Sequence, residues 1–304
     1  MRKFENNIVI FSVMLCWASA YVFIKGLPEE LTDFGYLALM NGIAALILVL
    51  LFLPRLAKLT KQTLIHSIVL GLLMTLVLLF EKEGIDRLAP ASASVLTSLD
   101  IVIVPVVMMF LLKMPTRSQI IAIVLILTGV LITNGVDPDE FPVAGTLFML
   151  GDCICMSFYN VVSNRYTQED DPILLAVVQL VVMAIVSMVI WNLESPGQIF
   201  MLEYDRSFLS SLFVLAIFTK AFAYIMLMFG EKYGDPVDVV LIFALEPVIT
   251  LILSVFIPES FGGVEEDFSL RALVGAVVIV IGSMIGNLDW KEVFRRLKRS
   301  EVPQ

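Results

Sequence analysis

The sequence predicts an all-α polytopic membrane protein with ten transmembrane helices, arranged as two inverted five-helix repeats. The first observation is composition. Of the 304 residues, 59% are hydrophobic and 16% charged, with a mean hydropathy of +0.94, whereas a soluble domain is about 45–50% apolar. The second is a series of apolar runs long enough to cross a bilayer. The third is a similarity between the two halves of the chain, and no loop is long enough for a separate soluble domain.

Ten apolar runs are expected to span the membrane, because a helix needs about 20 residues to cross roughly 30 Å of hydrocarbon. They cover residues 8–26, 31–53, 63–81, 89–112, 117–135, 142–164, 172–192, 207–230, 236–257 and 270–288. Turn-forming and helix-stopping residues separate them, namely Pro28, Pro54, Pro115, Pro138, Pro172, Pro196, Gly234 and the pair Gly262-Gly263. The first run continues through Val22 beyond the small residues Ala18-Ser19-Ala20, so we expect a retained span and no signal-peptide cleavage.

The positions of lysine and arginine predict a plasma (inner) membrane protein with both termini in the cytosol, because cytosolic loops carry an excess of these residues. The segments assigned to the cytosol hold Arg2, Lys3, Arg55, Lys58, Lys61, Lys113, Arg117, Arg165, Lys232, Lys291, Arg295, Arg296, Lys298 and Arg299. The opposite segments hold only Lys25, Lys82, Arg87, Arg206 and Arg271. Lys220 fits neither group, because it lies within the eighth run.

The two halves of the chain resemble each other around one acidic position. Residues Pro90–Asp100 align without a gap on Pro236–Glu246, so that proline meets proline and Asp100 meets Glu246. We therefore divide the chain into a first repeat at 1–136, a second at 137–290 and a basic cytosolic tail at 291–304. Since each repeat has an odd number of spans, the second lies upside down relative to the first.

A carboxylate in the middle of a span is costly, at about 2.5 kcal/mol or more, unless it faces protein or water. Glu246 is followed at once by Pro247, which removes a backbone donor and tends to bend a helix. A charge beside a broken backbone at mid-membrane depth is typical of a binding or gating element.

Several segments resemble EamA-type transporters of the drug/metabolite transporter superfamily. In the second half these are Leu245-Glu246-Pro247-Val248, the acidic Pro258-Glu259 and a final span with Gly275 and Gly282; in the first half, Trp17–Lys25, Ala93–Leu99 and Gly129-Val130. The resemblance implies ten helices in two inverted repeats, alternating access, and a central cavity lined by the first, third, fourth, sixth, eighth and ninth spans. It leaves the cargo open, because relatives move amino acids, amines, nucleotide sugars or phosphorylated sugars; export is the family's commoner role. Asp100 departs from the family, in which that position is more often uncharged.

Lys220 is expected to pair with a deep acid, and Asp100, Glu246 and Asp152 are the three alternatives. If it pairs with one of them, the others leave the cavity net negative, which favours a cationic or zwitterionic cargo. A phosphorylated or sulfated cargo is disfavoured, because no cluster of cavity arginines is available to hold it. An internal salt bridge with a purely structural role is the alternative interpretation of these charges.

Polar and aromatic residues share helical faces with these charges. Thr97 accompanies Asp100, Tyr224 accompanies Lys220, Trp17 accompanies Tyr21, and Tyr159 accompanies Asp152, while Asn41 and Gln179 are lone amides. The alternative for each aromatic is packing between helices or at the lipid interface. The substrate-binding or coupling candidates are therefore Asp100, Glu246, Lys220, Trp17, Tyr21, Thr97, Asp152, Tyr159, Tyr224, Asn41 and Gln179.

The remaining features indicate structure. Cys16, Cys153 and Cys155 all lie in apolar runs and suggest neither disulfides nor a metal site. Gly282 and Gly286 form a GxxxG that allows close approach of a neighbour, either the fifth span or a second protomer in a homodimer. His66, the single histidine, is expected to be an ordinary interfacial residue.

Together these features predict a secondary transporter, with export favoured, for a small metabolite, amino acid or organic amine. We expect no cofactor, alternating access that is either proton-linked or facilitative, and the bilayer and a small-molecule substrate as partners, with no nucleic acid. The first alternative is a facilitative channel or scaffold. The second is an intramembrane enzyme that uses Asp100 and Glu246 as acid and base, but the sequence has no phosphate loop, metal-ligand cluster or nucleophile pairing to support it.

Overall fold

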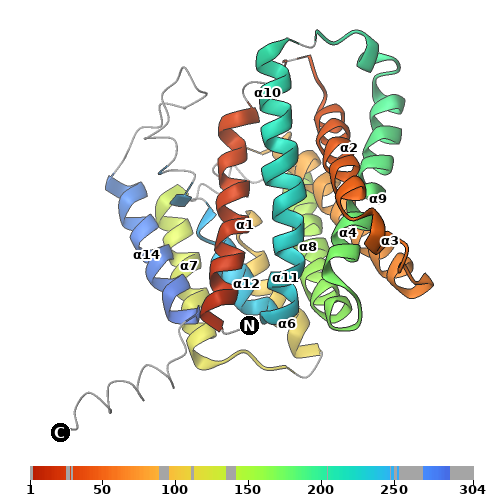
Figure 1. Cartoon of the computed structure of the whole chain (residues 1–304). Coiled ribbons are helices and arrows are strands. Elements are labelled where there is room, and N and C mark those ends of the chain that lie inside the picture. Colours follow the sequence, from red (N-terminus) through yellow and green to blue (C-terminus); the bar gives the residue numbers. More distant parts are fainter. Residues whose placement is uncertain are drawn as a thin grey trace, which may run out of the picture.

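The computed structural model describes residues 3–24, 28, 30–88, 96–110, 113–134, 142–203, 205–246, 248–249, 252 and 270–287. In these ranges the chain forms helices and no strand (Figure 1). The elements are α1 (Lys3–Ile24), α2 (Asp33–Leu51), α3 (Leu53–Leu56), α4 (Lys61–Ile85), α6 (Asp100–Phe110), α7 (Arg117–Asn134), α8 (Val143–Glu169), α9 (Pro172–Glu194), the 3₁₀ turn η2 (Gln198–Phe200), α10 (Arg206–Val214), the π-helical segment η3 (Leu215–Phe222), α11 (Ala223–Tyr233), α12 (Pro236–Phe243) and α14 (Leu270–Asn287).

Helix starts coincide with side chains that can accept a hydrogen bond from the first turn. The hydroxyls of Thr32 and Thr60 accept from the backbone N–H groups of Gly35 and Thr63, at 3.1 and 3.0 Å. The carboxylates of Asp171, Asp205 and Asp235 cap α9, α10 and α12 in the same way. Such caps satisfy backbone donors that a helix leaves unpaired, so these polar residues fix where the apolar runs become helical.

Each of the ten predicted runs contains helix, but the helices do not all match a complete span. Five helical stretches are long and apolar enough to cross a membrane by length and composition: Asp33–Leu51, Lys61–Gly84, Val143–Glu169, Pro172–Glu194 and Phe208–Tyr233. Shorter apolar helices occupy the fourth, fifth and tenth runs. The polytopic membrane fold is therefore confirmed, whereas the number of ten spans stays a prediction. The basic tail at 291–304 lies outside the described residues.

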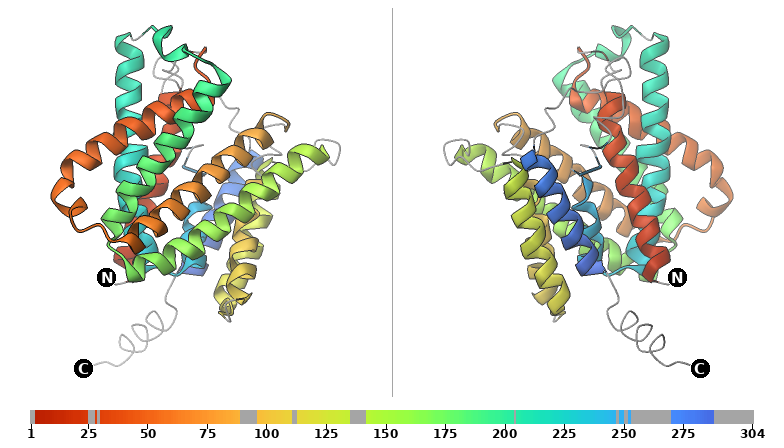
Figure 2. Two further views of the ribbon diagram at one scale, coloured as in Figure 1. Left: turned by 90° about the vertical axis from the view of Figure 1, so that its right-hand side faces the viewer. Right: turned by 90° about the vertical axis from the view of Figure 1, so that its left-hand side faces the viewer.

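The packing of the helices follows the predicted repeat. The first-half elements α1, α2, α4, α6 and α7 correspond to α8, α9, α10–α11, α12 and α14. Two of these equivalent pairs pack directly together, α7 on α14 and α2 on α9, and the other packings also occur in matched pairs (Figures 1 and 2). α4 lies against α8 as α11 lies against α1, and α6 contacts α8 as α12 contacts α1. This pattern is what a pseudo-two-fold axis between two repeats produces.

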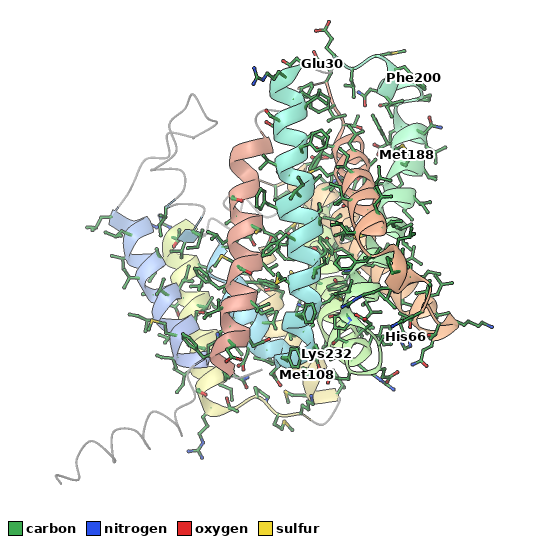
Figure 3. All side chains as sticks on the ribbon, in the orientation of Figure 1. Glu30, His66, Met108, Met188, Phe200 and Lys232 are labelled. Atoms are coloured by element: carbon green, nitrogen blue, oxygen red, sulfur yellow. The ribbon has the colours of Figure 1, made fainter. Side chains whose placement is uncertain are left out.

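The equivalent helices run in opposite directions. Asn6, at the start of α1, donates to the carbonyl oxygen of Gly230 at 3.2 Å, and Asn164, near the end of α8, donates to that of Gly234 at 2.9 Å. The start of α1 and the end of α8 therefore meet at one end of the bundle, which we call the N-side. Figure 3 shows Lys232 and His66 at the N-side, and Glu30 and Phe200 at the opposite end.

Glycines allow α7 and α14 to approach closely. A Cβ atom on Gly282 would lie 2.8 Å from Cγ1 of Ile126, and one on Gly286 would lie 2.9 Å from Cβ of Ala122, both on α7. The GxxxG face of α14 is therefore covered within the chain by α7, which is the predicted fifth span. This is the first of the two neighbours that the sequence allowed, and the glycines need no second protomer to explain them.

Candidate functional site

Both mid-span acids follow a two-residue break in a helix. Helix at Leu96-Thr97 gives way to a turn at Ser98-Leu99 before α6 begins at Asp100, and α12 gives way to a turn at 244–245 before Glu246. The hydrogen bonds match as well. The N–H of Leu99 donates to Leu96 and that of Leu245 to Ile242, each at 3.0 Å and each three residues back. The break recurs at the same repeat position, while Pro247 itself lies outside the described residues.

Four carboxyl groups from separate parts of the chain interact through their charges. Asp152 of α8 is 4% exposed, and its carboxyl group interacts electrostatically with those of Glu81 on α4 and Asp100 on α6. The carboxyl group of Glu246 interacts with the same two carboxyl groups. We call Glu81, Asp100, Asp152 and Glu246 the central acidic cluster. In the described part of the chain no three metal-ligating side chains converge on one point, so the four acids surround a region and do not form a compact metal centre.

Lys220 is the cation that faces this cluster. It lies in the π-helical segment η3 and is 8% exposed, with its Nζ 5.6 Å from the centroid of the Tyr224 ring. π-helical turns are uncommon and often mark functional sites. The acid whose charge acts on Lys220 is Glu81, and within the described ranges no carboxylate oxygen pairs with its Nζ directly. The acid whose charge acts on Lys220 is therefore a fourth one, in addition to the three predicted alternatives Asp100, Glu246 and Asp152.

Aromatic rings adjoin Lys220. The indole N–H of Trp17 on α1 donates to the carbonyl oxygen of Thr219 at 3.1 Å. The Trp17 ring centroid lies 6.2 Å from that of Tyr224 and 5.2 Å from that of Phe243. These contacts join α1 of the first repeat to η3, α11 and α12 of the second. The structure thus brings Trp17 and Tyr224 to Lys220, whereas the side chain of Tyr21 lies outside the described residues.

The other predicted residues lie elsewhere or at the margin. Tyr159 is fully buried and donates from its hydroxyl to Oε1 of Gln179 at 3.2 Å, between α8 and α9. Asn41 is fully buried on α2, which packs on α9. Thr97 is exposed at the helix break before Asp100. For Asn41, Tyr159 and Gln179 the structure describes no polar contact with the central acidic cluster.

His66 has a more defined environment than the sequence suggests. Its Nδ1 lies 2.6 Å from Oδ2 of Asp170, and its ring stacks on that of Tyr166 with centroids 3.7 Å apart. The hydroxyl of Thr63 donates to the other oxygen of Asp170 at 2.6 Å. These contacts tie the start of α4 to the end of α8 at the N-side, away from the central acidic cluster.

Two acids were not among the predicted site residues, the half-buried Glu81 and the buried Glu231. The expected third span ended at residue 81, but α4 continues to Ile85, so Glu81 falls inside the helix. Glu231 is fully buried although the eighth run was expected to end at residue 230. The sequence does contain a signal for both acids, because the matching pairs Glu81-Lys82 and Glu231-Lys232 lie where the third and eighth runs end. A third residue, Tyr36 on α2, was also missed and interacts electrostatically with Glu81.

The inverted repeats and the helix breaks beside acids define a polytopic membrane protein of the architecture that many secondary transporters share. The chain belongs to the EamA-like transporter family, whose model matches residues 6–135 and again residues 143–288. It is therefore a membrane transporter of the drug/metabolite transporter superfamily. The fold is also similar to that of a solved structure titled "Crystal structure of protein", with a TM-score of 0.75 and 19% identity over 96% of this chain and 98% of that chain. No curated protein matches the sequence.

Proposed function

We propose that the protein moves a cationic or zwitterionic small molecule, an organic amine or an amino acid, across the plasma (inner) membrane. In this proposal the protein works by alternating access, exports its substrate, and couples export to the movement of protons. The observation that carries the substrate class is the excess of acids at the centre, where four carboxyl groups interact with one another and Lys220 acts on one of them, Glu81. A cationic ligand would pair with such an acid in place of the proton, and none of the four acids has a direct ion-pair partner among the described residues.

Aromatic rings support the same substrate class. Trp17 and Tyr224 lie beside Lys220, and an aromatic face attracts ammonium groups by about 0.5–2 kcal/mol. For a zwitterion, Lys220 offers a contact for the acidic end. Anionic cargo is disfavoured, because every arginine that the structure describes is exposed and buried arginines are the usual clamp for phosphate.

The repeats support alternating access. Asp100 and Glu246 occupy equivalent helix breaks in two oppositely directed halves, so rocking of one half against the other would change which side of the membrane reaches both acids. Carboxyl groups at such breaks can exchange a proton for a cation at the same place, which is the basis for proposing proton coupling and no other cofactor.

Two other functions fit the observations less well. A facilitative channel or scaffold would explain the spans, but it has no need for equivalent acids at matched helix breaks. An intramembrane enzyme would use Asp100 and Glu246 as acid and base, but the protein belongs to a family of transporters. Neither alternative accounts for the buried Lys220 beside aromatic rings.

Transport by the purified protein in liposomes tests the proposal. We expect saturable uptake of at least one labelled cation or zwitterion from a panel of amino acids, polyamines, choline-like cations and nucleosides. Asp100→Asn should abolish or uncouple this uptake, while Asp205→Asn, which keeps a helix-capping side chain far from the site, should retain it. Unchanged transport and pH dependence in Asp100→Asn would remove Asp100 from the mechanism. Non-saturable flux would favour a channel, and chemical change of the solute would favour an enzyme. Uptake of phosphorylated solutes alone would contradict the proposed substrate class.

A further inference from the structure

Glu231 is a buried carboxyl group with no assigned role. It lies on α11, three residues before Gly234 at the N-side, and it is 0% exposed. Both of its carboxyl oxygens are buried and have no hydrogen-bond partner among the described residues. It is also separate from the central acidic cluster, since none of the four carboxyl groups there interacts with it in the described structure.

An ionised carboxylate in such a place would be unstable. Removing a charge from water without a partner costs far more than burying a neutral group, so a carboxyl group in this environment is held as the neutral acid. One proton on Glu231 removes the buried charge and supplies a donor as well. A bound proton is therefore the simplest way to stabilise this side chain in its buried position.

The groups around Glu231 do not supply a compensating cation. From α8 the Tyr159 hydroxyl faces it, and from the start of α12 the carboxylate of Asp235 adds negative charge. α1 contributes the amide of Asn6, whose Oδ1 is buried and also has no described partner. Lys3 and Lys113 act on Asp235 instead. The Tyr159 hydroxyl donates to Gln179 of α9.

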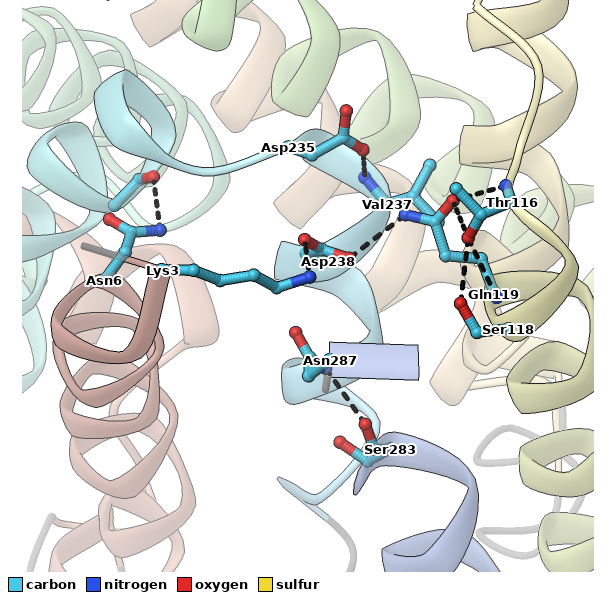
Figure 4. Close-up of polar contacts among 11 residues, drawn as sticks. Lys3, Asn6, Thr116, Ser118, Gln119, Asp235, Val237, Asp238, Ser283 and Asn287 are labelled. Carbon is cyan, nitrogen blue, oxygen red and sulfur yellow. Dashed lines mark hydrogen bonds and ion pairs between the residues drawn. The ribbon is translucent and has the colours of Figure 1, made fainter. Parts of the chain in front are cut away.

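Three amide side chains seal the N-side around this acid. Asn6 donates to the carbonyl oxygen of Gly230 (Figure 4). Asn164 donates to those of Glu231 and Gly234, and Gln168 to that of Lys232 at 2.6 Å. These bonds join α1 and α8 to the end of α11, so opening of the N-side must break them and admit water to the Glu231 carboxyl group.

We propose that Glu231 is a proton-binding site that is protonated while the N-side is closed and that releases its proton when the N-side opens. On opening, the carboxyl O–H bond breaks, the proton passes to water at the N-side, and the carboxylate remains hydrated; closure reverses the step. The proposal deepens the proposed transport function, because it links one proton to one conformational change. It does not depend on the identity of the cargo.

Infrared spectroscopy of the purified protein in lipid tests proton binding without any substrate. At neutral pH an exposed glutamate is ionised, since its pKa is about 4.3, so only sheltered carboxyl groups contribute a protonated-carboxyl band. We expect Glu231→Gln to remove one such component, while the exposed Glu194→Gln leaves the band unchanged. An identical band in the parent and in Glu231→Gln would overturn the proposal.

Cysteine alkylation tests the link to opening, and its measurement on the parent does not require Glu231→Gln to fold. In a cysteine-free background, Thr167→Cys places a thiol at a fully buried N-side position, and Lys58→Cys provides an exposed thiol that corrects for the intrinsic pH dependence of the reaction. The ratio of the two alkylation rates should rise with pH in the parent and become low and independent of pH in Glu231→Gln. A ratio independent of pH in the parent would overturn the link. Both measurements stand even if no cation is transported, so failure of the proposed function is distinguishable from failure of this one.

Discussion

Lys3 and Asp238 form an ion pair between the first helix of one repeat and the fourth helix of the other, with 2.8 Å between Nζ and Oδ2 (Figure 4). The second carboxylate oxygen of Asp238 accepts from Nε2 of Gln119, at the start of α7, at 3.0 Å. Gln119 is itself held by the backbone N–H of Thr116, which donates to its Oε1 at 2.8 Å. One carboxylate on α12 thus binds two helices of the first repeat at the N-side.

Asp238→Ala should open the N-side more readily than Lys3→Ala. Loss of Asp238 leaves Gln119 without its acceptor as well as removing the ion pair. The Lys3 side chain is 40% exposed, so the pair alone contributes at most about 1 kcal/mol. The rate of alkylation of Thr167→Cys relative to Lys58→Cys measures opening. High salt should cancel the effect of Lys3→Ala but not that of Asp238→Ala. Equal effects of the two variants would mean that the Gln119 bond contributes nothing to closure.

Asp235 predicts a dependence of stability on pH. Burial raises the pKa of this carboxyl group above its usual value, and the charge of Asp238 adds to the increase, although the backbone N–H of Val237 and the charges of Lys113 and Lys3 oppose it. Because the folded state then binds the proton more tightly than the unfolded state, the contribution of Asp235 to stability is greatest at low pH. It is lost as pH rises from the ordinary value of about 3.9 through the raised pKa.

Two substitutions separate this effect from helix capping. Asp235→Asn keeps a side chain that can cap α12 and removes the titration, so the melting temperature in detergent should equal or exceed that of the parent at neutral pH and lose this part of its pH dependence. Asp235→Ala also removes the cap and should be about 1 kcal/mol less stable than Asp235→Asn at every pH. If Asp235→Asn melts below the parent at neutral pH, the carboxylate stabilises the folded state and the expected sign is wrong.

Glu81→Gln should rescue part of the damage caused by Lys220→Met. Lys220 is buried, and the charge that acts on it is that of Glu81. Removing the lysine alone leaves that acid without the opposite charge that acts on it, and an uncompensated charge is more destabilising than replacement of both groups by neutral ones. We expect the double variant to give more monodisperse protein and a higher melting temperature than Lys220→Met. The matched control is the double variant of Asp152→Asn with Lys220→Met. If Asp152→Asn rescues Lys220→Met and Glu81→Gln does not, the acid that interacts with Lys220 is Asp152 and not Glu81.

The order of the elements and the repeat could be predicted from the sequence, because both depend on local signals. Caps such as Asp235 and prolines such as Pro172 mark helix starts, and the gap-free alignment of Asp100 on Glu246 predicts equivalent positions. The structure shows that this equivalence extends to the hydrogen bonds of the two helix breaks.

The convergence of side chains at the centre could not be predicted in the same way. Trp17 and Thr219 are 202 residues apart, and their contact depends on how α1 packs on η3. The π-helical geometry around Lys220 shifts the faces that ordinary helical spacing assigns. Glu81 was placed at the end of the third predicted span, yet α4 continues past it to Ile85.

Gly129 and Gly42 provide a matched pair for testing the packing of the repeats. A Cβ atom on Gly129 would lie 2.8 Å from the carbonyl oxygen of Gly275 and 2.7 Å from Cγ1 of Ile279, so α7 and α14 would have to move apart. A Cβ atom on Gly42, in the interior of α2, would meet nothing within 4 Å. Alanine is a better helix former than glycine by about 1 kcal/mol. We expect this gain in stability at Gly42 and not at Gly129.

We therefore expect Gly129→Ala to lower the melting temperature of the purified protein, and Gly42→Ala to leave it unchanged or raise it. Gly129→Leu should lower the yield of folded protein further, because a larger side chain meets backbone atoms of α14 that cannot rotate away. A Gly129→Ala variant as stable as Gly42→Ala would show that α7 and α14 separate without loss of stability. In that event the close approach of these two helices would not contribute to holding the repeats together.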